Sequence, residues 1–208
     1  MPAPNRVTPT GAIVAIDQRG LFMGNRGCLH REPRVIARPW QIRRWITCVL
    51  EHKGWRAPVW EPGRWTPLFF WDEAVALAAG HRPCALCRHA DHVRWLDAWE
   101  AAHGERLRVD PMDRRLHADR LDGRAQRRHR RAWTDLPVGT FVALDPDREN
   151  TPALVAGDRV VPWTVAGYGP AVERPGRGDA AVLTPRCTVD VLAHGYRPVL
   201  HGGAGVPG

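Results

Sequence analysis

Cys84 and Cys87 form a C-x2-C motif in the segment Cys84-Ala85-Leu86-Cys87. Two thiolates at this spacing can reach one tetrahedral metal ion, because the turn between them points backbone N–H groups at the sulfurs. The same spacing also occurs in redox pairs. The N-terminus shows no basic segment followed by an apolar one, so we expect a cytoplasmic protein whose thiols stay reduced. We therefore predict a structural zinc ion with Cys84 and Cys87 among its ligands.

Three upstream residues are candidates for the remaining two ligands: Cys28 and His30 in GNRGCLH, and Cys48 in WITCVL. Cys28 and His30 would point to opposite sides of an extended segment, so we favour Cys48 with one of these two. The alternatives are a buried apolar thiol for Cys48 and ordinary loop residues for Cys28 and His30. Cys187, the fifth cysteine, is interpreted as a structural or free thiol.

The segment TPLFFWDEAVALAAGHRPCALCR, residues 66–88, resembles the second half of the Ada-type zinc domain. That domain opens the bacterial adaptive-response DNA methyltransferase and recurs in some nucleases. The family has a strand, a helix of the form EA-x-x-x-x-AG, and an aromatic-Arg-Pro-Cys-x-x-Cys motif. The matching residues are Glu73, Ala74, Ala79, Gly80, Arg82, Pro83, Cys84 and Cys87, with His81 at the aromatic position. The resemblance implies zinc, a small zinc-centred fold and DNA as partner.

The first half of the family's pattern is missing from this chain. Ada-type domains take their other ligands from a C-x3-C or His-x3-Cys pair upstream of the second motif, and this sequence has neither at that place. In the methyltransferase, the cysteine that accepts a methyl group lies in that missing pair. The resemblance therefore supports the metal and the local fold better than it supports methyl transfer.

The chain is strongly basic, with a formal net charge of +8 and a pI near 10.2. Such a charge favours an anionic partner such as nucleic acid, although Lys53 is the only lysine and so arginine-rich a composition also follows from GC-rich coding. Residues 120–131 hold six arginines and one aspartate. On a helix they would form a stripe that follows phosphates, or else a solvated basic face. The predicted nucleic-acid-binding residues are Arg43, Arg44, Arg124, Arg127, Arg128, Arg130 and Arg131.

Several other features allow both a functional and a structural interpretation. Tryptophans alternate with arginines between residues 38 and 71, where they can stack on bases or fill the core around the metal. The segment GNRG, residues 24–27, is either an anion-binding nest or a simple turn. His117, Asp119 and His129 are candidates for acid–base catalysis. On one helix, however, His117 and Asp119 would face different sides. We find no P-loop, dinucleotide fingerprint, nucleophile elbow or H-E-x-x-H motif.

The pattern of the chain predicts an α+β fold in three parts. We expect a zinc-centred module of short strands and two helices at 11–104, a basic helical connector at 105–135, either continuous or interrupted at Gly123, and a small β-rich subdomain at 136–200. The tail 201–208 is expected to be disordered. Within the module we predict strands at 11–16 and 66–71, a hairpin at 43–60, and helices at 72–80 and from Cys87 to about Gly104. Residues 188–194 should form one or two helical turns.

These observations predict a zinc-stabilised nucleic-acid-binding protein, with DNA favoured by the resemblance, acting in repair or processing. One alternative is a metalloenzyme or acid–base enzyme that acts on a small or nucleotide-like substrate in a cleft around His117. Another is a scaffold in which zinc only holds the fold. The sequence contains no apolar run of 18 residues, so we expect no membrane partner.

Overall fold

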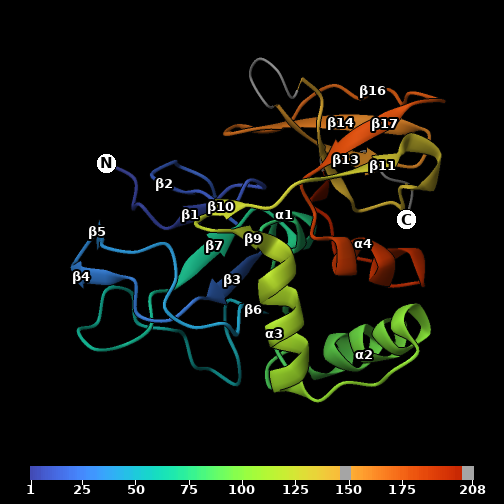
Figure 1. Ribbon diagram of the computed structural model, residues 1–208. Coiled ribbons are helices and arrows are strands. Elements are labelled where there is room, and N and C mark those ends of the chain that lie inside the picture. Colours follow the sequence, from blue (N-terminus) through green and yellow to red (C-terminus); the bar gives the residue numbers. More distant parts are fainter. Residues whose placement is uncertain (146–150, 203–208) are drawn as a thin grey trace.

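The computed structural model describes residues 1–145 and 151–202, and it has an α+β fold (Figure 1). Both helices and several sheets are present, as predicted. The helices are α1 (Glu73–Ala78), α2 (His89–His103), α3 (Val109–Arg120) and α4 (Arg186–Ala193), with a short 3-10 turn at Trp133–Asp135. Among the described residues, no helix has the length and hydropathy needed to cross a bilayer. The predicted tail falls largely on 203–208, outside the described residues.

The first sheet gathers short strands from the N-terminal part of the chain in the order β2-β1-β7-β3-β6-β8. Its strands are β1 (Arg6–Val7), β2 (Ile13–Val14), β3 (Phe22–Asn25), β6 (Ile46–Cys48), β7 (Leu68–Phe70) and β8 (Arg82–Pro83). β4 (His30–Glu32) and β5 (Val35–Ile36) form a separate hairpin. At the sheet's edge, β6 and β8 run parallel, with Ile46 opposite Arg82 and Thr47 opposite Pro83.

The predicted hairpin at 43–60 is only half right. Its first strand is β6, and the turn at Lys53-Gly54 is present, with both residues at positive φ. The second strand is absent, and pairing beyond the turn is limited to one bridge between His52 and Trp55. Trp55 is 52% exposed, and the segment that follows it packs no continuous face against the sheet. Without burial of one face, its β-rich composition does not produce a strand.

Helix α1 lies between the first sheet and the C-terminal sheet, and all six of its residues are buried (Figure 1). Asp72 is its N-cap, as predicted, and accepts a hydrogen bond from the backbone N–H of Val75 at 2.9 Å. Asp72 also accepts from the hydroxyl of Tyr168 at 2.8 Å, and Glu73 accepts from Tyr196 at 2.6 Å. Both tyrosines belong to the C-terminal part of the chain.

Helices α2, α3 and α4 pack together in a second apolar cluster. Trp95 and Trp99 of α2 are completely buried there, in contact with residues of α3 and α4. The helix predicted after Cys87 is therefore present, and it ends at Gly104 as expected. The helical turns predicted at 188–194 lie within α4, which begins two residues earlier, at Arg186.

The predicted helical connector is wrong beyond residue 120. Helix α3 ends at Arg120, and the arginine-rich run continues as β9 (Leu121–Asp122), β10 (Ala125–Gln126) and β11 (His129–Ala132). β9 and β10 form a hairpin with Gly123 and Arg124 at its two-residue turn. Gly123 has φ +60°, the conformation that a II′ turn requires at its first central position. The chain therefore turns at Gly123 and Arg124, where a helical connector was predicted.

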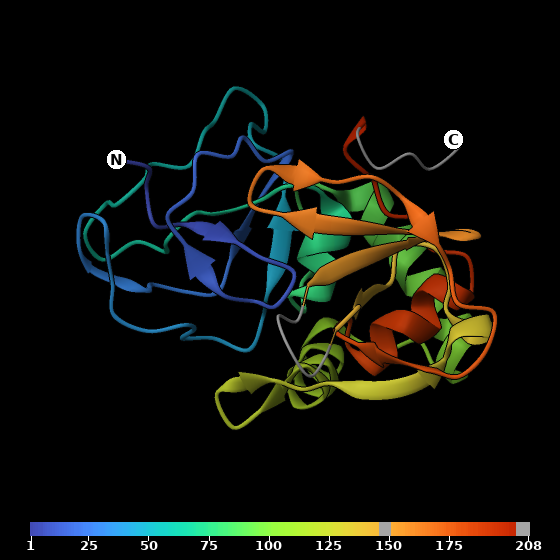
Figure 2. The same cartoon turned by 90° about the horizontal axis from the view of Figure 1, so that it is seen from above.

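The C-terminal sheet begins inside the predicted connector, because β11 pairs with β17. The sheet contains β12 (Phe141–Ala143), β13 (Pro152–Ala156), β14 (Arg159–Thr164), β15 (Gly167–Tyr168), β16 (Val172–Glu173) and β17 (Asp179–Val182). The two sheets lie side by side (Figure 2). They share a core, since Phe70 of the first sheet and Phe141 of the second belong to the same buried cluster around α1.

Candidate metal centre and arginine face

Cys48, Cys84 and Cys87 come together as a group of possible metal ligands, with all three sulfurs within 4.8 Å of one another. Cys48 ends β6, and Cys84 directly follows β8, so the parallel pairing of these strands brings the two thiols side by side. The turn after Cys84 returns Cys87 to the same place. The pair predicted from the C-x2-C motif and the favoured upstream cysteine therefore share one site.

The donor set fits a soft divalent metal. Three thiolates about 2.3 Å from a tetrahedral ion lie about 3.8 Å apart, which the 4.8 Å limit accommodates. The backbone N–H of Leu86 donates to the Cys84 sulfur at 3.4 Å. Hydrogen bonds from Cys48, Cys87 and backbone N–H groups lower the pKa of Cys84, while the same cluster raises the pKa values of Cys48 and Cys87. Without a metal the three thiols therefore share one negative charge, and a bound cation would be needed to ionise the other two.

Cys28 and His30 lie outside this group. The ring of His30 contacts the hydroxyl of Thr66 at 2.6 Å and the carbonyl of Glu61 at 3.2 Å, so both nitrogens are already engaged. The Cys28 sulfur lies 3.7 Å from the carbonyl of His30. In this arrangement neither residue supplies the fourth ligand expected from the sequence. Cys187 lies in α4, where burial raises the pKa of its thiol to about 12.

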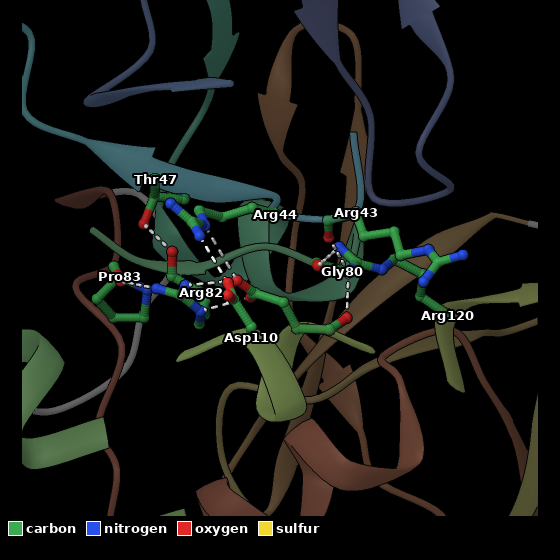
Figure 3. A network of polar contacts seen from close by, with 9 residues as sticks. Arg43, Arg44, Thr47, Gly80, Arg82, Pro83, Asp110 and Arg120 are labelled. Carbon is green, nitrogen blue, oxygen red and sulfur yellow. Dashed lines mark hydrogen bonds and ion pairs between the residues drawn. The ribbon is translucent and has the colours of Figure 1, made fainter. Parts of the chain in front are cut away.

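Four arginines are buried among the described residues, and they form two groups: two pair with carboxylates and two do not. Arg82 makes two hydrogen bonds of 2.8 Å to the carboxylate of Asp113, and Arg88 pairs with Glu73 at 2.8 Å. Figure 3 shows Arg82 beside the exposed pair Arg44–Asp110. These contacts satisfy the rule that a buried charge needs an opposite charge.

Arg26 and Arg120 lack such an ion pair in the described part of the chain, although they are only 1% and 2% exposed. Arg26 donates to His81 at 3.2 Å and to the carbonyl of Gly11 at 3.0 Å. Arg120 donates to the carbonyls of Gly80 at 2.6 Å and Arg43 at 2.8 Å (Figure 3). Desolvation lowers the pKa of both guanidiniums to about 9.

Trp45 and His81 position these two arginines. The guanidinium carbons of Arg26 and Arg120 lie 4.1 and 4.3 Å from the centre of the Trp45 ring, which is a cation–π contact in each case. Burial, Arg26 and Arg120 together lower the pKa of His81 well below its usual value. Neutral His81 can then accept a hydrogen bond from Nε of Arg26 at its Nε2 atom, while its Nδ1 donates to the carbonyl of Ala76. A neutral histidine thus orients Arg26 without adding a third charge.

Exposed arginines surround the buried pair. We use the name arginine face for the surface formed by loop 37–44, α3 and the β9–β10 hairpin. Two open grooves lie on it. One of about 450 Å³ is lined by Arg38 and Arg124, and one of about 490 Å³ by Arg43 and Arg114 together with the carboxylates of Asp110 and Asp113, which pair with Arg44 and Arg82. Arg38, Arg43, Arg114 and Arg124 form no ion pair within residues 1–145 and 151–202, so their charges are available to a ligand.

The arginines predicted to bind nucleic acid do not form one stripe. Arg43, Arg44 and Arg124 lie on the arginine face, although Arg44 pairs with Asp110 at 2.6 Å. Arg127 and Arg128 follow the hairpin, and Arg127 donates to the carbonyl of Leu121. On β11, Arg130 lies 3.8 Å from Asp179 and Arg131 lies 2.8 Å from Asp190 of α4.

The three residues predicted for acid–base chemistry make separate contacts. The ring of His117 stands edge-on to Trp40, with ring centres 4.8 Å apart. Asp119 accepts from the backbone N–H of Cys187 at 2.7 Å, at the start of α4, and His129 contacts the carbonyl of Thr184 at 3.0 Å. These contacts do not assemble a His–Asp pair around His117, and catalysis by these residues stays a prediction.

Sequence reasoning missed His81 and Arg114 as members of a site, and it reached Arg38, Trp45 and Arg26 only as parts of the tryptophan–arginine run and the GNRG segment. Two signals were present: Arg26 lies inside the glycine-flanked GNRG segment, and His81 replaces an aromatic residue of the resembled motif. Comparisons of the chain with protein families, curated proteins and solved structures found no match.

Proposed function

We propose that this protein binds nucleic acid on the arginine face, and that a zinc ion held by Cys48, Cys84 and Cys87 stabilises the strands beneath that face. The observation that carries the proposal is a set of four exposed arginines around the buried pair that form no ion pair with any described residue: Arg38, Arg43, Arg114 and Arg124. Basic side chains left free of carboxylates suit the phosphates of a nucleic-acid backbone.

Zinc is the metal that best suits three thiolates, two of them from a C-x2-C turn, in a small module of short strands. Cys48 and Cys84 join β6 to β8, and the residues just before these strands contact the buried arginines. A metal at this place would hold the arginine face in shape. DNA is favoured over RNA because of the resemblance of residues 66–88 to the Ada-type zinc domain.

The first test measures the binding of a fluorescent duplex and a fluorescent single strand, as DNA and as RNA, between 50 and 200 mM salt. The logarithm of affinity should fall linearly with the logarithm of salt concentration. Replacing Arg38, Arg43, Arg114 and Arg124 with Gln should reduce this slope by up to about 3.6, given about 0.9 per lost duplex contact.

A matched control removes the same charge elsewhere. Arg19, Arg31, Arg177 and Arg186 are also exposed, and they line neither groove of the arginine face. Replacing these four with Gln should change the slope much less. Equal losses in both variants would assign the binding to net charge alone, and absence of binding at 50 mM salt would refute the proposal.

A further inference from the structure

A small, partly open pocket lies beneath the arginine face, with a volume of about 50 Å³. Its walls include Arg26, Arg120, Trp40 and Trp45. It adjoins the 450 Å³ groove, because Gly11, Pro39, Arg124 and Gln126 line both. The pocket is therefore a recess from the groove whose inner wall carries two buried positive charges.

Three hydrogen-bond donors in this wall have no partner among the described residues. They are the buried atoms Nη2 of Arg26, Nε of Arg120 and the indole Nε1 of Trp40. One acceptor of the same lining, Oε1 of Gln126, also has no partner among the described residues. Nη2 of Arg26 lies beside Gly11, which also lines the pocket. Buried donors are nearly always paired with protein or water, and unpaired indole donors also occur elsewhere in the described residues, at Trp95 and Trp99. What distinguishes this pocket is that two of its unpaired donors belong to positively charged guanidiniums, which suit an anion.

The charges lead to the same conclusion. The other two buried arginines, Arg82 and Arg88, each have a carboxylate, whereas Arg26 has none. An unpaired buried guanidinium is costly, and the chain fixes it there with His81, Trp45 and Gly11 instead of letting it reach solvent. A bound anion would supply the missing charge and accept the three free N–H groups.

The size and position of the pocket define the anion. A volume of about 50 Å³ holds a few water-sized atoms, which is room for one tetrahedral oxyanion but not for a base or a sugar. An internal phosphodiester carries a sugar on each side, so it cannot enter a recess of this size. A terminal phosphate monoester can enter, while its nucleotide stays in the groove, and it carries nearly two negative charges at neutral pH.

We propose that this pocket binds the terminal phosphate monoester of a nucleic-acid strand, with Arg26, Arg120 and the Trp40 indole as donors. The inference rests on the proposed function, because it assigns the neighbouring nucleotides to the groove with Arg38 and Arg124. It adds a preference for phosphorylated ends over internal sites.

Inorganic phosphate is the first probe. Thermal unfolding in a phosphate-free buffer should shift to higher temperature as phosphate is added, compared with chloride at equal ionic strength, because a ligand of the native state stabilises it. Calorimetric titration with phosphate should show one site per chain. No phosphate-specific stabilisation and no titration signal would overturn the inference.

Oligonucleotides identical except for their ends are the second probe. Strands with a 5′-phosphate, a 3′-phosphate or hydroxyls at both ends distinguish the two possible sources of the monoester. One phosphorylated strand should bind about tenfold or more tightly than the hydroxyl strand, as expected for new charge-assisted hydrogen bonds. Equal affinity of all three, with normal salt dependence, would refute the terminal-phosphate pocket and leave the proposed function intact.

Two variants assign the effect to the pocket. Arg26→Met should abolish both the phosphate-induced stabilisation and the preference for a phosphorylated end. Trp40→Phe removes the indole N–H and keeps one aromatic ring, so it should weaken both. This variant keeps the test decisive if Arg26→Met fails to fold. Trp55→Phe, at a 52% exposed position outside the pocket, should leave both unchanged. An unaltered end preference in Trp40→Phe and Arg26→Met would overturn the assignment. Arg26-dependent phosphate binding without any oligonucleotide binding would support the pocket and refute the nucleic-acid proposal.

Discussion

Trp45 and His81 face each other with ring centres 5.3 Å apart, one residue before the paired strands β6 and β8. Cys48 and Cys84 meet at the other end of the same pair, since Ile46 lies opposite Arg82 and Thr47 opposite Pro83. Two short parallel strands thus join the candidate metal centre to the buried arginines. We therefore expect a substitution at the cysteine end of β6 and β8 to alter the packing of Trp45 and His81 at the other end.

Loss of a metal ligand should release the metal and lower stability. Cys84→Ser is expected to reduce bound zinc from about one per chain to near zero and to lower the unfolding temperature sharply, because structural zinc contributes folding free energy directly. Elemental analysis and thermal unfolding measure the two effects. Cys28→Ser, outside the sulfur group, is the control and should keep its metal. Metal-free wild-type protein purified under reducing conditions would contradict the prediction.

Removing the carboxylate of Asp113 should be far more harmful than removing that of Asp110. Asp113→Asn leaves Arg82 buried without its counter-charge and should cost about 3–5 kcal/mol of unfolding free energy. Asp110→Asn breaks the exposed pair with Arg44 and should cost less than about 1 kcal/mol. Urea unfolding of both variants gives the comparison. Similar losses would mean that burial does not determine the strength of the Arg82 pair.

Gly80 should tolerate a side chain poorly. It has φ +85°, and a Cβ there would lie 2.7 Å from Cδ of Arg120, so Gly80→Ala should cost about 2–4 kcal/mol. Gly104 has φ +71° with nothing within 4 Å of its Cβ position, and Gly104→Ala should cost only about 1 kcal/mol. Denaturant midpoints measure the difference. A loss at Gly80 no larger than at Gly104 would show that the contact with Arg120 relaxes freely.

The free energy of unfolding should fall as the pH is lowered from about 6.5 to about 4, because folded His117 stays neutral in this range. Burial lowers the pKa of His117 to about 4, with Arg120 and Arg43 adding to the effect. An unfolded histidine titrates near 6.5, so between about 6.5 and 4 the unfolded chain binds a proton that the folded chain does not. Unfolding free energy should therefore be full above pH 6.5 and should decline below it.

The variant His117→Phe keeps an aromatic ring against Trp40 and removes the titration. Urea unfolding at pH 7.5 and pH 5 should show a smaller decline for this variant than for the wild type. An identical decline in both proteins would assign the pH dependence to other groups, such as His81, whose pKa is lowered in the same direction.

The sequence was sufficient where the signal is local. The C-x2-C spacing, the Asp72 cap and the glycine that ends α2 involve residues close in the chain, and the structure has each as predicted. The choice of Cys48 over Cys28 and His30 depends on the pairing of β6 with β8 across 36 positions of the chain. No local pattern determines such a contact.

For the arginines, the sequence was not sufficient. Composition indicated a basic surface, but burial decides which arginines matter, and burial is a tertiary property. Nothing in the sequence separates Arg120, which is buried, from its exposed neighbour Arg124, and the glycines around Arg26 do not show that its side chain is buried. The interpretation of 120–131 as a helix failed because one glycine turn reverses the chain, which separates arginines that a helix would have aligned.

Helix α1 determines how the chain can be divided. Its buried carboxylates, Asp72 and Glu73, receive their hydrogen bonds from Tyr168, Tyr196 and the backbone of Val199. A fragment that ends near residue 135 keeps both carboxylates and loses all three donors, while its apolar helix becomes exposed to water. The cysteine-rich part therefore depends on the C-terminal residues for its fold, and we do not expect it to fold when it is transferred by itself to another protein.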